Sequence, residues 1–270
     1  MINLIAVSDL HLGFDSPNKP FQLNVAEKVD LVLMAGDIID GCKASGFDWV
    51  LNATNEKPVL ITLGNHELYG TRRDKAIKAF RDAFDNTHVQ FLLNESIVFN
   101  NIRFCVTDLW TDFALFGNQA HAMKSAESMM NDYRRIKVKI GEQYRKLKPI
   151  DTMAWHQESR VFIEKTLNES KEAVVLMTHH GVSRKGISPI YQGSPLNPAF
   201  ASDLEPLFES AKQAPILSIF GHSHAFVNEI LDCGTVIYCN ARGYNGHEKV
   251  EGFDPTRIIS IDENNLVSIG

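Results

Sequence analysis

The stretch INLIAVSDLH, residues 2–11, contains a pattern that the rest of the chain repeats. Residues 2–7 are almost all apolar, and an unbroken run of this length is typical of a strand that is buried on both faces. Asp9 and His11 follow two positions apart, so an extended backbone would point both side chains to the same side. A buried strand that ends in a carboxylate and an imidazole indicates a ligand site at the carboxyl end of a sheet.

Short apolar runs of the same kind recur along the chain between turn residues. They cover residues 29–35, 59–63, 173–177, 216–220 and 235–239. Helical patterns lie between several of them, at residues 72–84 and 203–212, and residues 257–261 and 266–269 have the pattern of a closing hairpin. We therefore predict an α/β or α+β sandwich with helices on the outside.

Residues 111–159 interrupt this pattern, because they are polar, rich in Met and charged residues, and contain no buried-strand run. We predict that they form a mainly helical insertion or cap over one end of a single domain, which spans residues 1–270. An ordinary pair of connecting helices is the alternative. The basic run at residues 134–148 lies inside this segment and would either steer an anionic substrate or form a solvated face.

The bulk composition disfavours two classes of protein. The formal net charge of −6 argues against a general nucleic-acid coat protein, although a local basic groove is compatible with it. No apolar run in the sequence is long enough to span a bilayer, and residues 2–7 lack the positive flank of a signal peptide. We therefore expect a cytoplasmic protein without a membrane partner, in an oligomeric state that the sequence leaves open.

Five of the predicted strands end in residues that bind metal ions well. Their ends read SDLH at 8–11, GDIID at 36–40, GNHE at 64–67, THHG at 178–181 and GHSH at 221–224. The carboxyl ends of adjacent strands meet at one edge of an open sheet, so these side chains are expected to converge. Carboxylates, imidazoles and one amide oxygen, without thiolate, suit Mn, Fe, Zn, Co or Ni better than Ca or Mg. We therefore predict two divalent transition-metal ions at this edge.

In this order the five blocks resemble the signature of the calcineurin-like metallophosphoesterase superfamily, which reads DxH, GDxxD, GNH(D/E), H and GHxH. The resemblance covers residues 2–244 apart from the segment 111–159. It implies a two-sheet β-sandwich flanked by helices and the activity of a metal-dependent phosphoric ester hydrolase. The expected substrate is a small molecule or nucleotide with a phosphomonoester or phosphodiester bond.

Residue by residue, the resemblance also implies seven metal ligands. The first metal would take Asp9, His11 and His224, the second would take Asn65, His179 and His222, and Asp37 would bridge the two. His179 is expected rather than His180, because the first histidine of this block follows the strand directly. His66 would be the catalytic histidine that faces the substrate, and Asp40 would be its hydrogen-bonded orienting partner.

The implied chemistry rests on electrostatics. Two dications would depress the pKa of a bridging water, and the resulting hydroxide would attack phosphorus in line near neutral pH. His66, oriented by Asp40, would stabilise the transition state or protonate the leaving oxygen, a contribution of about 10²–10⁴-fold. No covalent intermediate with the enzyme is required.

Two other functions remain as alternatives. A nuclease that cleaves nucleic-acid phosphodiesters would use the same metals but needs an open, basic groove, which the acidic net charge disfavours. A non-catalytic metal-binding scaffold would usually lose ligands or the catalytic histidine, whereas Asp37, Asn65 and His66 all remain. Gly41 stands where the protein Ser/Thr phosphatases of this superfamily carry a phosphate-gripping Arg, so a phosphoprotein substrate is disfavoured.

Arg242, in the stretch NARGY at residues 240–244, is compatible with two roles. Its guanidinium could bind a substrate phosphate in a bidentate manner. A structural salt bridge fits its place in the sequence equally well.

Overall fold

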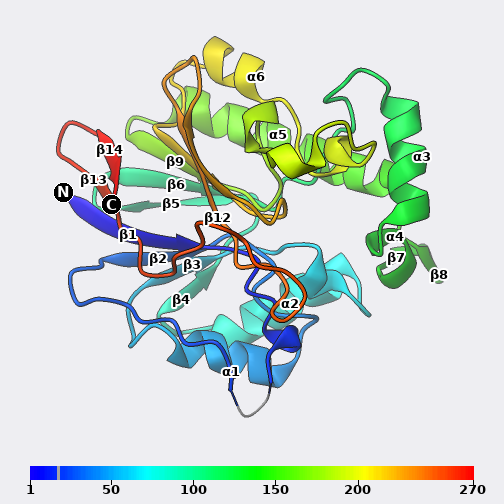
Figure 1. Ribbon diagram of the computed structural model, residues 1–270, viewed down its shortest axis with the longest axis horizontal. Helices are drawn as coiled ribbons and strands as arrows, with labels where there is room; N and C mark the ends of the chain where they lie inside the picture. Colours follow the sequence, from blue (N-terminus) through cyan, green and yellow to red (C-terminus); the bar gives the residue numbers. More distant parts are fainter. Residues whose placement is uncertain (17–18) are drawn as a thin grey trace.

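The computed structural model describes residues 1–16 and 19–270, and its main feature is a pair of six-stranded sheets (Figure 1). The first sheet has the order β14-β13-β1-β2-β3-β4, formed by Val267–Ile269, Ile259–Ile261, Ile2–Val7, Leu31–Met34, Val59–Ile61 and Val89–Phe91. The second has the order β11-β12-β10-β9-β6-β5, formed by Phe226–Ile230, Val236–Asn240, Leu217–Phe220, Ala173–Met177, Ile102–Val106 and Glu95–Phe99. The expected closing hairpin is present as β13 and β14, which pair antiparallel.

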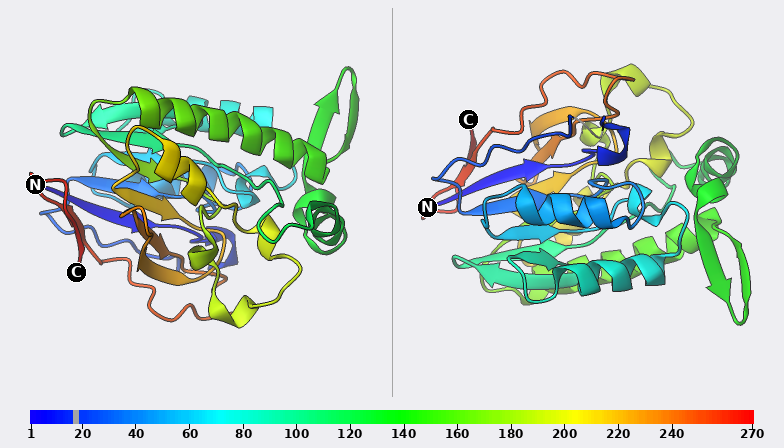
Figure 2. Two further views of the ribbon diagram at one scale, coloured as in Figure 1. Left: turned by 90° about the horizontal axis from the view of Figure 1, so that it is seen from above. Right: turned by 90° about the horizontal axis from the view of Figure 1, so that it is seen from below.

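Helices cover the outer face of each sheet, which confirms the predicted two-sheet sandwich flanked by helices (Figures 1 and 2). Helices α1 (Ala44–Asn52) and α2 (Arg73–Phe84) lie on the first sheet, whereas α5 (Pro149–Glu169) and α6 (Glu205–Ser210) lie on the second. Short 3-10 helices, η1 to η5, occupy Leu12–Phe14, His66–Leu68, Arg184–Gly186, Pro189–Tyr191 and Asn197–Ala199. Across the described ranges, we find no helix with the length and apolar character needed to cross a bilayer.

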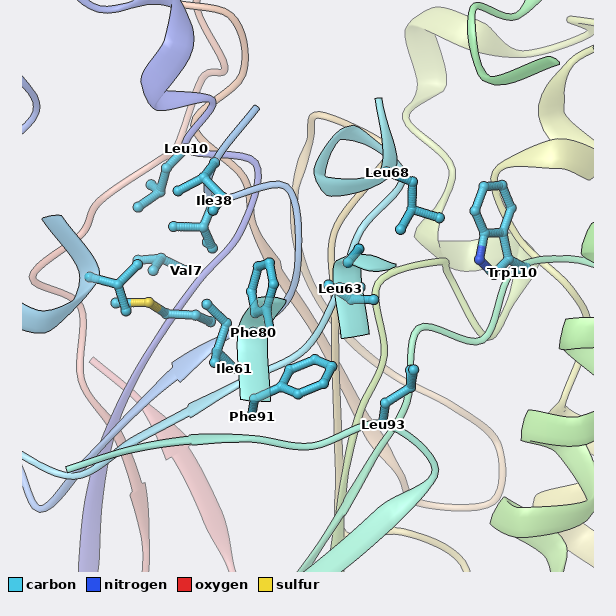
Figure 3. Close-up of a cluster of buried hydrophobic side chains, with 14 of the residues drawn as sticks. Val7, Leu10, Ile38, Ile61, Leu63, Leu68, Phe80, Phe91, Leu93 and Trp110 are labelled. Carbon is cyan, nitrogen blue, oxygen red and sulfur yellow. The ribbon is translucent and has the colours of Figure 1, made fainter. Parts of the chain in front are cut away.

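Apolar packing on both faces explains why the strands read as unbroken apolar runs. Leu4 and Leu33 of the first sheet pack in one buried cluster with Phe104 of the second. Ile61 belongs to the cluster on the other face of the first sheet, where Phe80 of α2 packs (Figure 3). Full burial of one such side chain stabilises the fold by about 1.5–3 kcal/mol. This packing holds the sheets in place, and with them the loops that follow the strands.

The parallel strands end at the same level within each sheet. Val7 of β1 pairs with Met34 of β2, which in turn pairs with Ile61 of β3. In the second sheet, Met177 of β9 pairs with Ile219 of β10. The loops that follow these five strands therefore emerge at one end of the sandwich.

The segment 111–159 contains α3 (Gln119–Met129), α4 (Asp132–Arg135) and the start of α5, and it lies at the end opposite the two termini (Figure 2). It also contains a hairpin of β7 (Lys137–Ile140) and β8 (Gln143–Lys146), which the sequence analysis did not predict. Most residues of this hairpin are charged or polar and exposed, so no apolar run reveals it. Helix α5 continues past residue 159, and its last turns carry Ile163 and Leu167 into the core.

Candidate metal centre

Loops at the carboxyl ends of β1, β2, β3, β9 and β10 bring the seven candidate ligands together. Donor atoms lie within 4.8 Å of one another in each of three groups, Asp9–His11–His224, His11–Asp37–His66 and Asp37–His179–His222. Asn65 joins the third group, because its Oδ1 lies 3.0 Å from His179 Nε2. The structure therefore places all seven residues, and also His66, in one cluster.

Asp37 lies between the two sets of donors. Its Oδ2 is 3.6 Å from His11 Nε2, and its Oδ1 is 3.6 Å from His179 Nε2. On the side of His11, His224 Nε2 lies 3.1 Å from His11 Nε2 and 3.4 Å from Asp9 Oδ1. A carboxylate whose two oxygens face two separate donor sets has the geometry that a bridging ligand requires.

The backbone is strained at five of these positions. Asp9, His11, Asp37, His222 and His224 have φ values between 42° and 63°, in the left-handed region that residues other than glycine rarely adopt. Each such residue costs on the order of 1 kcal/mol or more, which the surrounding contacts must offset. Strain of this kind concentrates at functional sites.

Glu67 and Gly64 hold two of the loops against each other. The buried Glu67 carboxylate accepts hydrogen bonds from the backbone N–H groups of Asp37, Ile38 and Gly64, at 3.0, 2.8 and 2.7 Å. A Cβ atom on Gly64 would clash with the Asp37 carboxylate and the His179 ring. The glycine thus lets the β3 loop approach closely, and Glu67 fixes the turn that carries Asp37.

The donor set fits divalent transition metals. Within the described residues, the buried His222 Nε2 has no hydrogen-bond partner, and leaving such an atom unsatisfied costs about 1–3 kcal/mol. His179 Nδ1–H donates to the Ala35 carbonyl at 2.9 Å, so the lone pair on Nε2 faces the cluster. Imidazole, carboxylate and amide donors in this combination suit Mn, Fe and Zn.

Burial keeps the imidazoles on one side of the cluster neutral. It lowers the pKa of His179 to about 4 and holds the pKa of His180 and His222 well below the usual value. A neutral imidazole has a free lone pair for a metal ion at pH 7. Burial also raises the pKa of Asp37, and nearby carboxylates, chiefly Glu67, raise it further. Bound cations would relieve this repulsion between carboxylates.

His224 on the other side is held in its charged form. Burial acts to lower the pKa of His224, but hydrogen bonds to Asp9 and Glu248 outweigh burial and raise the pKa to about 10. The same interaction holds the pKa of Asp9 below its usual range, although burial acts to raise it. A metal ion bound at His224 Nε2 would therefore displace a proton.

His66 stands beside the donor sets. Its Nδ1–H donates to Asp40 Oδ1 at 2.7 Å, and the Tyr244 hydroxyl lies 3.0 Å from its Nε2. The ring packs against Tyr69, with ring centroids 4.2 Å apart. Burial acts to raise the pKa of Asp40, but hydrogen bonds from His11 and His66 hold it below its usual range. The pairing expected between His66 and Asp40 is thus present in the structure.

Two acidic residues that the sequence analysis missed orient candidate ligands. The buried Asp132 carboxylate of α4 accepts hydrogen bonds from Asn65 Nδ2 at 2.7 Å and from the Tyr69 hydroxyl at 2.9 Å. Glu248 accepts a hydrogen bond from His224 Nδ1. Neither acid belongs to a motif, and Asp132 is 67 positions from Asn65, so no local signal in the sequence points to either.

Of the two roles left open for Arg242, the structure shows the salt bridge. Its Nη2 donates to Asp15 Oδ1 at 2.7 Å, and its Nη1 donates to the Leu10 carbonyl at 2.9 Å. The guanidinium also lies over the ring of Phe21, 4.5 Å from its centroid. These contacts tie the loop after β12 to the loop after β1.

His180 is directed toward the protein interior, unlike its neighbour His179. Its Nδ1 lies 3.1 Å from the Asp108 carbonyl oxygen, and its ring stacks on Trp110 with centroids 4.9 Å apart. These contacts fit the expectation that His179 is the donor of this block.

A cavity of about 390 Å³ adjoins the cluster. Polar side chains from the cluster form one wall, among them Asp37, Asn65, His66, His222 and Tyr244. Apolar and aromatic side chains also line the cavity, among them Met129, Met130, Tyr191, Leu196 and Phe200. The metal-binding edge therefore opens onto a space in which an organic phosphoester can lie, which we call the inner cavity.

Three solved structures of known proteins share this fold. Phosphopantetheinyl hydrolase from Mycobacterium tuberculosis matches with a TM-score of 0.67 and 19% identity over 90% of this chain and 89% of its own. A dimetal phosphatase from Danio rerio matches with a TM-score of 0.56 and 14% identity over 97% and 93%. GAP50, the anchor in the inner membrane complex of Plasmodium, matches with a TM-score of 0.53 and 12% identity over 99% and 83%. At these identities the likeness concerns the fold alone.

Sequence comparison identifies the family. Uncharacterized protein L509 of Acanthamoeba polyphaga mimivirus is 28% identical over 214 residues, which are 74% of this chain and 72% of the relative. The family model for calcineurin-like phosphoesterases matches residues 2–226, a range that includes all five sequence blocks. The chain therefore belongs to the calcineurin-like phosphoesterase family and is a metal-dependent phosphoric ester hydrolase.

Proposed function

We propose that this enzyme uses two metal ions to hydrolyse a phosphomonoester or phosphodiester bond in a small molecule or nucleotide. The observation that carries the proposal is the position of Asp37 between two donor sets, with His66 next to Asp37 and His11. Asp9, His11 and His224 would hold one ion, Asn65, His179 and His222 would hold the other, and Asp37 would contact both. The donor types support manganese, iron or zinc in these sites.

The chain's own residues would orient the ester and move a proton. When bound, divalent ions lower the pKa of a water molecule and stabilise negative charge on phosphoryl oxygens. His66 keeps its Nδ1–H on Asp40, so Nε2 is the atom that can pass a proton to the leaving oxygen. Tyr244 lies next to Nε2, and burial, followed by the charges of Asp37 and Asp9, raises the pKa of its phenol. Tyr244 therefore stays protonated and can donate a hydrogen bond to the ester.

The inner cavity argues against the nuclease alternative. Among the described residues that line it there is no Lys or Arg, whereas Asp132 and Glu248 both line it. A protein that follows a nucleic-acid backbone needs cationic side chains along its path. A small organic phosphoester is thus the better substrate class, and the name of the phosphopantetheinyl hydrolase suggests one compound for a substrate panel.

The test compares the hydrolysis of a chromogenic phosphodiester with that of the matching phosphomonoester, after the protein has been stripped with chelator and reloaded with Mn²⁺. We expect metal-dependent turnover of one class and a bound transition metal by elemental analysis. A strong diester preference would favour nucleotides or other diesters, and a strong monoester preference would favour a small-molecule phosphatase. Absence of bound metal after reloading would contradict the proposal.

The Asp37→Asn variant tests the bridging role. It should abolish turnover and weaken both metal sites, because the amide cannot supply two anionic oxygens to two cations. Asp48→Asn, the same change on an exposed residue of α1, is the matched control and should behave as the parent protein. Retained turnover in Asp37→Asn would overturn the bridging assignment.

A further inference from the structure

We infer that the substrate carries one phosphoryl group and a long, uncharged organic arm, and that the arm lies in a second cavity beyond the metal centre. The inference rests on the proposed function, because the arm belongs to the ester that the metal centre would hydrolyse. It adds the chemical class of the substrate and the place where the protein recognises it.

The second cavity, called here the outer cavity, borders the inner one. Its volume is about 760 Å³, compared with about 390 Å³ for the inner cavity. Both are lined by Ile187, Ser188, Ser194 and Asn197. Binding sites for organic ligands usually measure about 300–1,000 Å³. The inner cavity alone can hold a phosphoryl group with a short substituent, so the outer cavity provides room for a much longer one.

The walls of the outer cavity come from two segments that are distant in sequence. One wall is the loop after β9, from residue 184 to residue 198, which contains η3, η4 and the start of η5. The other wall contains Phe116 and Ala122 of the segment 111–159. Helix α3 of that segment packs against η5, so the two walls are in contact at one side. The insertion thus shapes the space in which the arm would lie.

The charges along both cavities argue against further phosphates in the arm. No Lys or Arg among the described residues lines the inner cavity. Among the described residues that line the outer cavity, Arg184 is the one Lys or Arg. Its Nε lies 3.6 Å from Asp203 Oδ2, so a carboxylate already offsets the charge of the guanidinium. A second phosphate would require cationic side chains with free donors. For a diphosphate or triphosphate arm, the described lining of the two cavities thus offers a single Lys or Arg side chain, which already pairs with a carboxylate.

The outer cavity is instead suited to an arm in which apolar carbons alternate with amide or hydroxyl groups. Apolar contacts come from Phe116, Ala122, Ile187, Pro189, Pro195 and Pro198. Neutral hydrogen-bonding side chains line the same cavity, namely Asn118, Ser188, Gln192, Ser194 and Asn197. A small number of polar groups at fixed positions in a mainly apolar pocket determines the orientation of a neutral ligand.

Two phosphoesters that differ only in the arm test this inference on the metal-loaded enzyme. Ethyl phosphate has a short arm, and the phosphate of N-hexanoyl-ethanolamine has a long neutral arm with one amide. Both are assayed as monoesters and as methyl diesters, with products followed by ³¹P NMR. We expect kcat/KM for the long arm to exceed that for the short arm by at least about tenfold, because several additional CH₂ groups become buried.

Ser194 lines both cavities, so the Ser194→Trp variant should fill space where they meet. It should reduce the ratio of kcat/KM for the long arm to that for the short arm toward one. Ile187→Asn removes an apolar contact that both cavities share, without adding bulk, and it should also lower the ratio. Ser210→Trp places the same bulky side chain at an exposed position of α6 and should leave the ratio at the parent value.

Saturation-transfer NMR with N-hexanoyl-ethanolamine, which has the arm but no phosphate, gives a readout that does not require turnover. We expect a signal with the parent protein and a weaker one with Ser194→Trp. Equal kcat/KM for both arms, together with no NMR signal, would overturn the inference while leaving the hydrolase function intact. Better hydrolysis of a nucleoside triphosphate than of the long neutral ester would overturn it as well. An NMR signal without any ester hydrolysis would support the arm site and contradict the proposed function.

Discussion

At the scale of single residues, the site combines strained backbone with donor atoms that lack protein partners. Five of the candidate ligands adopt left-handed backbone conformations, among them His11 and His224. His222 Nε2 is buried without a partner in the described residues. Both features cost free energy in the metal-free protein. Bound metal ions and a rigid core would offset this cost. The residues at this site are therefore arranged for ligand binding rather than for the stability of the fold.

The His66→Asn variant should keep its metal content and lose turnover by about 10²–10⁴-fold, the contribution typical of a proton donor. The loss should be largest for esters with poor leaving groups, because these depend most on protonation of the leaving oxygen. Steady-state rates on a series of aryl phosphoesters, with metal content determined in parallel, check this. His88→Asn, on a histidine distant in sequence and hydrogen-bonded to Thr54, serves as the control. An equal loss for good and poor leaving groups would exclude the proton-donor role.

His156 predicts a pH effect on stability that does not involve the metal centre. Burial lowers the pKa of His156 from 6.5, so this residue takes up a proton at a higher pH in the unfolded chain than in the folded chain. Stability is therefore lost as the pH falls below 6.5. His156→Gln keeps a donor for the Trp110 carbonyl but cannot titrate.

In urea unfolding of the metal-free proteins, the free energy of unfolding should fall less between pH 7.5 and 5.5 in His156→Gln than in the parent. His121→Gln, on an exposed histidine of α3, is the control and should follow the parent. The same pH dependence in parent and His156→Gln would contradict the assignment.

At the scale of elements, the segment 111–159 contributes to the candidate metal centre as well as to the cavities. Helix α4 carries Asp132, whose carboxylate accepts a hydrogen bond from the side-chain amide of Asn65. The Asn65 oxygen therefore faces His179. An amide can otherwise rotate and present either its oxygen or its nitrogen to the site. The segment 111–159 therefore orients a candidate ligand that belongs to a loop of the first sheet.

The Asp132→Ala variant should weaken metal binding at the site that contains Asn65 by about 10–100-fold, the usual effect of losing a partner that orients a ligand. Asp132→Asn keeps an acceptor oxygen and should restore most of the affinity. Calorimetric titration of the stripped proteins with Mn²⁺ measures this directly. Asp74→Ala, on an exposed residue of α2, is the matched control. Parent-like affinity in Asp132→Ala would show that Asn65 is oriented without it.

At the scale of the whole molecule, the candidate ligands come from both sheets. Asp9, Asp37 and Asn65 follow strands of the first sheet, whereas His179 and His222 follow strands of the second. A pair of ions at this edge would therefore connect the two layers of the sandwich. Because the folded chain brings these donors together and the unfolded chain does not, metal binding would stabilise the folded state.

Chelator treatment should lower the melting temperature of the enzyme, and Mn²⁺ should restore it. A free metal concentration of about 100 times Kd would add about 2.7 kcal/mol to the free energy of unfolding for one site. Ca²⁺ at the same concentration should have a much smaller effect, because imidazole donors suit it poorly. Thermal denaturation of parent and Asp37→Asn with each ion measures both effects. A melting temperature that does not respond to Mn²⁺ would argue against the metal centre.

The sequence alone predicted the strands that carry the site and placed the candidate ligands at their carboxyl ends. Runs such as residues 2–7 are apolar because their strands are buried on both faces. This local pattern is visible in the sequence even when the neighbouring strands are unknown. The donors stand directly after these strands, so knowing where the strands end also places Asp9 and Asp37. The partly exposed strands β5 and β11 were not predicted. Strands β4 and β6 were also missed, because Gln90 and Arg103 interrupt their apolar runs.

The features that only the tertiary structure determines depend on contacts between segments that are distant in sequence. Asp132 reaches Asn65 across 67 positions, and Arg242 reaches Asp15 across 227. A single acidic or basic residue in a polar loop has the same local pattern whether it faces solvent or a buried partner. The outer cavity likewise exists only because the loop after β9 lies against α3. Burial and pairing of such groups are properties of the packed molecule, which is why they became visible only in the fold.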